Sequence, residues 1–115
     1  MSAPDPVQTN RRLVLEDPQR LSDGAGGYRE SWADLGVVWA ELTPMTGRTS
    51  GQEGGSLSLQ RYRISLRATP QGAASRPRPG QRFRQGLRLF RIEAVSEADV
   101  MGRYLICQCI EEVAP

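Results

Sequence analysis

The stretch that decides the fold is residues 59–68, LQRYRISLRA, in which apolar and polar side chains alternate with a period of two. One face of this stretch carries apolar side chains, those of Tyr62, Ile64 and Leu66. The other face carries polar side chains, those of Arg61, Arg63, Ser65 and Arg67. This pattern is typical of a β-strand with one buried and one exposed face. It predicts a strand that contributes to a core and presents a row of Arg outward.

The same alternation recurs along the chain between Gly, Pro and Asp residues, which interrupt strands. Further strands are predicted at residues 11–16, 28–32, 36–43, 82–84, 87–95 and 103–111. Asp17-Pro18 and Pro44 are expected to end the first and the third of these, because proline cannot donate to a sheet ladder. A glycine-rich turn at residues 22–27 predicts a hairpin between the first two.

These short strands predict an all-β protein, a small six- or seven-stranded β-barrel, because closing the sheet protects its edges. The 115 residues are expected to form one domain at residues 11–115, after a flexible N-terminal arm at residues 1–10. Residues 45–58 and the Arg-Pro-rich residues 69–80 are predicted loops, the first long and flexible. The predicted interior consists of the apolar strand positions Leu13, Leu15, Val38, Leu42, Tyr62, Ile64, Leu66, Phe83, Phe90, Ile92 and Ile106.

Composition excludes several kinds of chemistry. The chain has no His and no Lys, so a Ser-His or Cys-His nucleophile and an ordinary zinc site are ruled out. Its two thiols, Cys107 and Cys109, are two residues apart in a predicted strand, which separates them by roughly 6.5 to 7 Å, at or beyond disulfide reach. We therefore expect buried free thiols, no metal, no cofactor and no enzymatic activity. No stretch is apolar enough to cross a membrane, which predicts a soluble protein made in a cytoplasm.

Charge is distributed unevenly along the chain. Residues 1–57 contain five Arg and eight acidic residues, whereas residues 58–115 contain ten Arg and five acidic residues. This asymmetry predicts a basic patch on one part of the surface. Such a patch could contact nucleic-acid phosphates or an acidic protein surface, and charge alone does not separate the two.

Several motifs in order resemble the tailed-phage head-tail joining family. In the first half they are RRLVLE at residues 11–16, DGAGGY at 23–28, Trp32, VWAEL at 38–42 with Pro44, and TGR at 46–48. In the second half they are YRISLR at 62–67, RPGQRF at 78–83 and LFRIEAV at 89–95. The resemblance covers about residues 10–112 and includes the equivalent connector part of gene transfer agents.

This resemblance implies a head-closure or stopper protein, a small β-barrel that is not an enzyme. Such a protein is synthesised in the bacterial cytoplasm and located at the neck of a phage or phage-like particle. It forms a ring, commonly of six copies, between the portal or adaptor ring and the tail terminator or tail tube. The resemblance also implies that residues 45–58 project into the channel and help to gate transient double-stranded DNA. The corresponding gating residues would be Thr46, Gly47, Arg48, Gly51, Gly54 and Gly55.

The Arg row of the central strand, Arg61, Arg63 and Arg67, is either a simple solvated face or a contact surface, and a contact surface has two interpretations. It could touch DNA phosphates in the channel, or it could pair with a neighbouring subunit through carboxylates such as Glu93, Glu111 and Glu112. We favour the subunit interface, because a dense cationic lining would hold passing DNA back. An alternative function is a small sequence-independent nucleic-acid-binding β-barrel. It has less support, because most of the seven aromatic residues fall on apolar faces and few remain to stack on bases.

Overall fold

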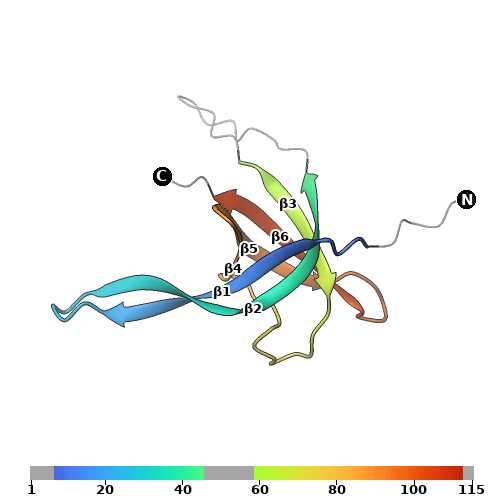
Figure 1. The fold of residues 1–115 in the computed structure, drawn as a ribbon. Helices are drawn as coiled ribbons and strands as arrows, with labels where there is room; N and C mark the ends of the chain where they lie inside the picture. Colours follow the sequence, from blue (N-terminus) through green and yellow to red (C-terminus); the bar gives the residue numbers. More distant parts are fainter. Residues whose placement is uncertain (1–6, 46–58, 113–115) are drawn as a thin grey trace, which may run out of the picture.

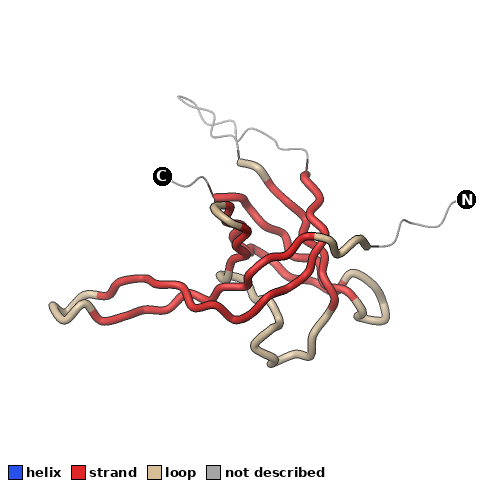
Figure 2. The backbone as a smooth tube through the Cα atoms, viewed as in Figure 1, coloured by secondary structure: helices blue, strands red, loops and turns tan. Residues whose placement is uncertain are grey.

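A computed structural model describes residues 7–45 and 59–112, and in this part of the chain it contains six strands and no helix. All neighbouring strands are antiparallel, and the sheet closes into a barrel in the order β1-β2-β3-β6-β5-β4 (Figures 1 and 2). The predicted all-β class and small barrel are confirmed. The strands are β1 (Arg11–Ser22), β2 (Tyr28–Met45), β3 (Arg61–Arg67), β4 (Arg82–Gln85), β5 (Arg88–Glu97) and β6 (Tyr104–Glu112).

The barrel interior is formed by the inward-facing apolar side chains of the strands, which alternate along each strand with outward-facing side chains. Ten of the eleven predicted interior residues are in the core, either fully buried or partly buried against it. Ile106 is the exception, because β6 pairs with β3 so that Cys107 lies opposite Ile64 and Leu105 lies opposite Leu66. Residues directly opposite each other share a face of the sheet, so Leu105 and Cys107 point inward and Ile106 does not.

Both cysteines are buried and free, as predicted. Burial raises the pKa of the Cys107 thiol to about 12 and also raises the pKa of the Cys109 thiol. Because the thiolate is the reactive form, neither cysteine reacts readily in the folded barrel.

Two predicted strand ends are wrong. β1 continues through Pro18 to Ser22, and β2 joins the predicted strands at residues 28–32 and 36–43 and continues through Pro44. Beyond Glu16, β1 is paired only with β2, and at Pro44 β2 is paired only with β3. Each proline therefore lies where one strand edge has no partner among the described residues, a position in which proline is tolerated.

The outer parts of β1 and β2 leave the barrel as a two-stranded ribbon, residues 17–34, which extends to one side (Figure 1). The ladder pairs Leu15 with Gly36 but Glu16 with Asp34, so Leu35 is an extra residue of β2. A bulge of this kind bends a strand and increases its local twist. Gly36 adopts a φ of 133°, which favours glycine, and Leu35 packs against the core. The bulge therefore marks the point where the ribbon diverges from the barrel.

Both ends of the ribbon are held by local contacts. At the tip, Asp23 Oδ1 accepts hydrogen bonds from the amides of Ala25 and Gly27, at 2.8 and 3.0 Å, so the predicted turn at residues 22–27 is confirmed. At the root, the predicted loop at residues 69–80 packs beside the ribbon, with Pro77 buried and Arg78 3.9 Å from Asp17. Most of the predicted N-terminal arm lies outside the described residues.

Candidate functional site

The predicted gating residues Thr46, Gly47, Arg48, Gly51, Gly54 and Gly55 lie outside the described residues, but the base of their loop is described. Met45, the last residue of β2, pairs with Arg61, the first residue of β3. The side-chain amide of Gln60 donates to the carbonyls of Met45 and Arg61, at 3.3 and 3.0 Å, and the Glu111 amide donates to the Gln60 carbonyl at 2.9 Å. The chain thus leaves and re-enters the barrel at adjacent, hydrogen-bonded strand ends.

The three residues of the predicted Arg row lie along β3 but have different surroundings. Arg61 forms an ion pair with Glu93 of the same chain at 2.9 Å, and both side chains are about half exposed. The Arg67 guanidinium lies 5.9 Å from the centre of the Tyr104 ring and is exposed. Arg63 is half-buried, and within residues 7–45 and 59–112 neither it nor Arg67 forms an ion pair.

Two carboxylates that the sequence suggested as partners in a neighbouring subunit are engaged within the chain. Glu93 is the extra residue of a bulge in β5, which turns it toward Arg61. Glu111 accepts two hydrogen bonds from the Arg88 guanidinium, at 2.8 and 3.2 Å. Arg63 and Arg67 therefore remain as the members of the row that are available for an external partner.

The Arg88 and Glu111 pair belongs to a polar cluster that sequence reasoning missed. Arg88 also donates to the Tyr62 hydroxyl at 3.0 Å, and its guanidinium lies 5.0 Å from the centre of the Phe90 ring. The hydrogen bonds from Arg88 lower the pKa of Glu111 more than burial raises it. Since the backbone amide of Glu111 donates to the Gln60 carbonyl, this cluster lies next to the base of the loop.

A second missed cluster lies at the root of the ribbon, around the buried carboxylate of Glu16. Arg82 Nε and Arg84 Nε donate to its two oxygens, at 2.7 and 2.9 Å. Arg84 also lies 3.6 Å from Asp34, and the Arg82 guanidinium stacks over Trp32, 3.9 Å from its ring centre. The cluster thus joins β4 to β1 and β2 at the root of the ribbon. The Arg-Phe-Arg alternation at residues 82–84 is the only sequence signal that points to it.

Glu16 is ionised in this setting, despite its burial. Burial by itself would raise the pKa of this carboxyl, but the hydrogen bonds from Arg84 and Arg82 outweigh it, and the net pKa is lowered. Removing one partner of a buried ion pair leaves an uncompensated charge, which is more costly than the loss of the pair's own attraction.

Replacing Glu16 by alanine is expected to lower the free energy of unfolding by about 3 to 5 kcal/mol, because two Arg side chains lose their buried partner. Urea unfolding followed by circular dichroism measures the change. Glu30→Ala, at an exposed position on the ribbon, is the matched control and is expected to stay within about 0.5 kcal/mol of the parent. Equal midpoints for the two variants would contradict the assigned role of Glu16.

Stability is also expected to fall in acid. Glu16 and Glu111 both have a lowered pKa in the folded chain, so their contribution is complete above the ordinary Glu value of 4.5 and is lost as the pH falls through their folded values. The urea midpoint should be steady at pH 5.5 to 7 and decline below roughly pH 4.5. Glu16→Gln, which does not ionise, should show a shallower decline than the parent, and a parallel decline would contradict this assignment.

Both clusters consist of ion pairs and hydrogen bonds between Arg and Glu side chains. Within residues 7–45 and 59–112, no three Cys, Asp or Glu side chains are close enough together to hold a metal ion. In the same part of the chain, nothing forms a helix long and apolar enough to span a membrane. The structure thus provides a closed barrel, a hydrogen-bonded base for the loop at residues 46–58, a strand with a row of Arg side chains (β3) and a projecting ribbon.

Comparison with known proteins identifies the family. The family model described as phage head completion protein matches residues 4–113. A solved chain from the virion of a native gene transfer agent particle is 48% identical, with a TM-score of 0.78, and the match covers 96% of this chain and 100% of that one. No curated protein matches. The resemblance to head-tail joining proteins and the location in a phage or phage-like particle are confirmed at this level: the chain belongs to the phage head completion protein family.

Proposed function

We propose that this chain is a head-closure, or stopper, subunit that forms a ring between the portal or adaptor complex and the tail of a phage or gene transfer agent particle. The observation that carries the proposal is the match of nearly the whole chain, in sequence and fold, to a chain of a gene transfer agent virion. Membership of the head completion family supports a structural rather than an enzymatic role. The ring, which we expect to have six copies, would contact the portal side with one face and the tail side with the other.

The base of the loop at residues 46–58 supports a role in gating the DNA channel. Strand pairing between Met45 and Arg61 and the Gln60 hydrogen bonds fix where the loop begins and ends. Glycines at Gly47, Gly51, Gly54 and Gly55 allow the segment between these points to change its path at little steric cost. We propose that this segment helps to gate the DNA channel.

The surroundings of the Arg row favour contact with a neighbouring subunit over contact with DNA. Arg61 is already neutralised by Glu93, which lowers the positive charge that the row could offer to a phosphate backbone. Arg63 and Arg67 would then pair with carboxylates across the ring interface. The nucleic-acid-binding alternative has less support, because Phe83 and Phe90 are buried in the core, and the two exposed aromatic rings, Tyr28 on the ribbon and Trp39 on the barrel, do not form one stacking surface.

Cryo-electron microscopy of particles from the source strain tests the proposal by locating this chain relative to the portal axis. A ring at the neck with residues 46–58 directed inward is the expected result. Absence of the chain from the particles would overturn it. In that case, strongly salt-dependent binding of the purified protein to DNA of unrelated sequences would favour the alternative.

A further inference from the structure

A groove without an occupant among the described residues lies on the barrel where β2 separates from β3. It has a volume of about 290 Å³ and is lined by Val37 and Trp39 of β2, by the buried Leu66, and by Thr69 and Ser75, which follow β3. The Val37 and Trp39 side chains are 46% and 54% exposed. Because they are two residues apart on one strand, they share a face and form a continuous apolar border to the groove.

The groove adjoins an unpaired edge of β2. This strand pairs with β1 from Tyr28 to Ala40, but its pairing with β3 begins only at Ala40. Within residues 7–45 and 59–112, the second edge of β2 therefore has no strand partner at residues 28–39. A free strand edge offers its N–H and C=O groups to an added extended segment. An occupant of the groove could therefore extend the sheet as well as cover apolar side chains.

A polar atom in the groove lining also lacks a partner. Thr69 Oγ1 is buried and has no hydrogen-bond partner among the described residues. Buried hydroxyls in folded proteins are nearly always hydrogen-bonded. The groove is therefore suited to an occupant that presents a hydrogen-bond acceptor, such as a backbone carbonyl, beside Thr69.

The N-terminal part of the chain enters the described structure at this groove. Thr9 is itself part of the groove lining, and the amide of Gln8 donates to the Glu41 carboxylate at 2.7 Å, which holds the chain against β2. Residues 1–6 lie outside the described residues. Six extended residues span at most about 20 Å. This segment is therefore tethered at the groove and is long enough to lie along it.

The sequence of residues 3–6, Ala-Pro-Asp-Pro, suits an added edge strand. In an extended strand, the backbone groups of alternate residues point to the same side. Ala3 and Asp5 could thus pair with β2, while Pro4 and Pro6 face away from it, the position in which an edge strand tolerates proline. The carbonyls of the two prolines would then point toward the side of Thr69, where a hydroxyl lacks an acceptor.

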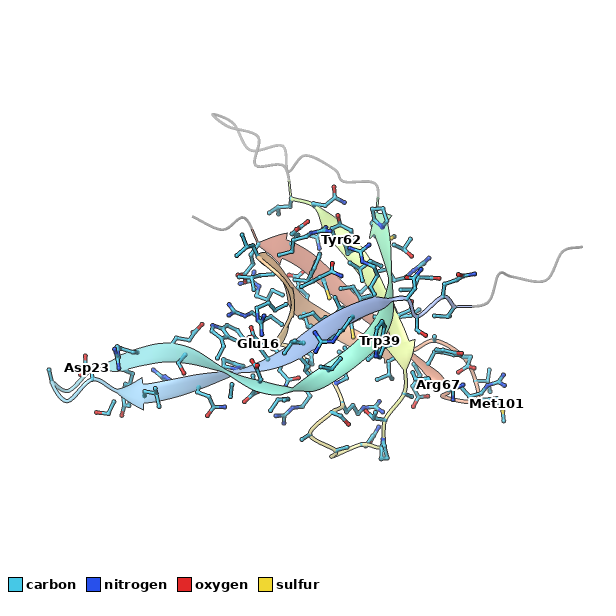
Figure 3. All side chains as sticks on the ribbon, viewed as in Figure 1. Glu16, Asp23, Trp39, Tyr62, Arg67 and Met101 are labelled. Carbon is cyan, nitrogen blue, oxygen red and sulfur yellow. The ribbon has the colours of Figure 1, made fainter. Side chains whose placement is uncertain are left out.

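Charge complements this fit. Asp5 is the only charged side chain among residues 1–10. Arg67 lines the groove, and the exposed Arg12 lies opposite Trp39 in the ladder. Figure 3 shows Trp39 and Arg67 on the same part of the barrel, away from the ribbon tip. In the part of the chain that the structure describes, neither Arg forms an ion pair, so both are available to a carboxylate in the groove.

We infer that residues 3–6 dock in the groove of their own copy as an additional edge strand, with Pro4 and Pro6 against its apolar floor and Asp5 near Arg67. The segment of the same copy is favoured over that of a second copy, because its tether at Gln8 gives it a high effective concentration at the groove. Docking would cover the open edge of β2 and so protect a free subunit from edge-to-edge association.

This contact goes beyond the proposed ring and is compatible with it. A guanidinium carries five N–H donors and can meet two carboxylates, as Arg84 does with Glu16 and Asp34. Arg67 could therefore contact Asp5 and still pair with a neighbouring subunit. Because the contact lies within one copy, the purified chain is sufficient to test it, and failure of the ring proposal would not affect the result.

Cross-linking in dilute purified protein tests the docking. The double variant Ala3→Cys/Ser75→Cys places one thiol on the segment and one at the exposed groove position 75, while the native cysteines are buried. A short bismaleimide should link the two sites within a monomer, as read by peptide mass spectrometry. Ala3→Cys/Leu87→Cys is the matched control: Leu87 is 93% exposed, and an undocked segment could reach it, because Arg11 bonds to the nearby Gln85 at 2.7 Å.

The groove pair should react roughly tenfold faster than the control pair. Equal rates, or no link to position 75, would overturn the docking, because the segment would then be free or bound elsewhere. Covalent dimers in place of linked monomers would also overturn it, since the segment would then occupy the groove of a second copy.

Fluorescence quenching supplies a readout that needs no new cysteine. Replacing residues 3–6 by Gly-Ser-Gly-Ser should raise the acrylamide quenching constant of Trp39 roughly twofold, because the ring loses the segment that covers it. The Trp39→Phe variant gives the contribution of Trp32, the other tryptophan, for subtraction. An unchanged quenching constant would overturn the docking.

Discussion

Deletion of residues 46–55 is expected to leave the barrel folded and to yield particles that leak DNA or fail to join tails. Five residues, 56–60, would then connect Met45 to Arg61, and hairpin loops of two to five residues join paired strands without strain. The ladder between β2 and β3 and the Gln60 hydrogen bonds do not include the deleted residues. We therefore expect the free energy of unfolding to stay within about 1 kcal/mol of the parent, because the closure entropy of a loop changes only slowly with its length.

Two measurements separate folding from function in this variant. Urea unfolding of the purified chain reports stability, and nuclease sensitivity of packaged DNA together with the fraction of tailed particles reports gating and joining. A variant that replaces residues 46–55 by a Gly-Ser segment of equal length is the matched control for loop length. If the deletion unfolds the purified chain, the loop is part of the core structure and the gating proposal is wrong. Particles that retain DNA and tails at parental levels would contradict the proposal as well.

The barrel could be predicted from the sequence because several of its strands, β3 above all, alternate apolar and polar side chains with a period of two. Residues 59–68 place Ile64 and Leu66 inward, and that pattern specifies which face is buried without any knowledge of the partner strands. The same logic failed for β6, where every residue from Leu105 to Ile110 except Gln108 is apolar or a thiol. An apolar run has no polar face to set its register, so the choice between Ile106 and Cys107 depended on pairing with β3.

The ribbon could not be predicted, because the length of its two strands depends on which other strands pair with them. Pro18 normally ends a strand, and it is tolerated here because β4 pairs with β1 only as far as Glu16. The break that the sequence suggested between residues 32 and 36 is a bulge at Leu35, and a bulge looks like a turn when the opposite strand is unknown. Sheet closure, which is a tertiary event, determines both features.

The ion-pair clusters around Glu16 and Glu111 could not be predicted from the sequence for a related reason. Glu16 is separated from Arg82 and Arg84 by 66 and 68 residues, and Glu111 is 23 residues from Arg88. The charge pattern predicted an excess of Arg in the second half of the chain but not which of these Arg residues would be neutralised. Arg82, Arg84 and Arg88 form ion pairs with carboxylates of the same chain. The basic surface is therefore smaller than the count of Arg residues indicated.

Ile64→Asp is expected to abolish folding at neutral pH. Ile64 is fully buried, with Leu42 and Cys107 opposite it on the two neighbouring strands. An aspartate there would lose the packing of a core isoleucine, about 2 to 5 kcal/mol in typical large-to-small changes. It would also bury a carboxylate with no cation to pair with, at a further cost of several kcal/mol. Together these losses match or exceed the roughly 5 to 15 kcal/mol by which a domain of this kind is stable.

Circular dichroism and urea titration check this outcome, with Gln108→Asp as the matched control. Gln108 is exposed on β6 and pairs with Arg63, so a carboxylate at that position stays in water beside a cation and should leave the urea midpoint nearly unchanged. The expected result is a cooperative transition for Gln108→Asp and none for Ile64→Asp. A folded, cooperatively unfolding Ile64→Asp protein would mean that position 64 faces solvent. The register of β3, and with it the outward placement of Arg63 and Arg67, would then be wrong, because a slip of one residue moves every side chain of a strand to the other face.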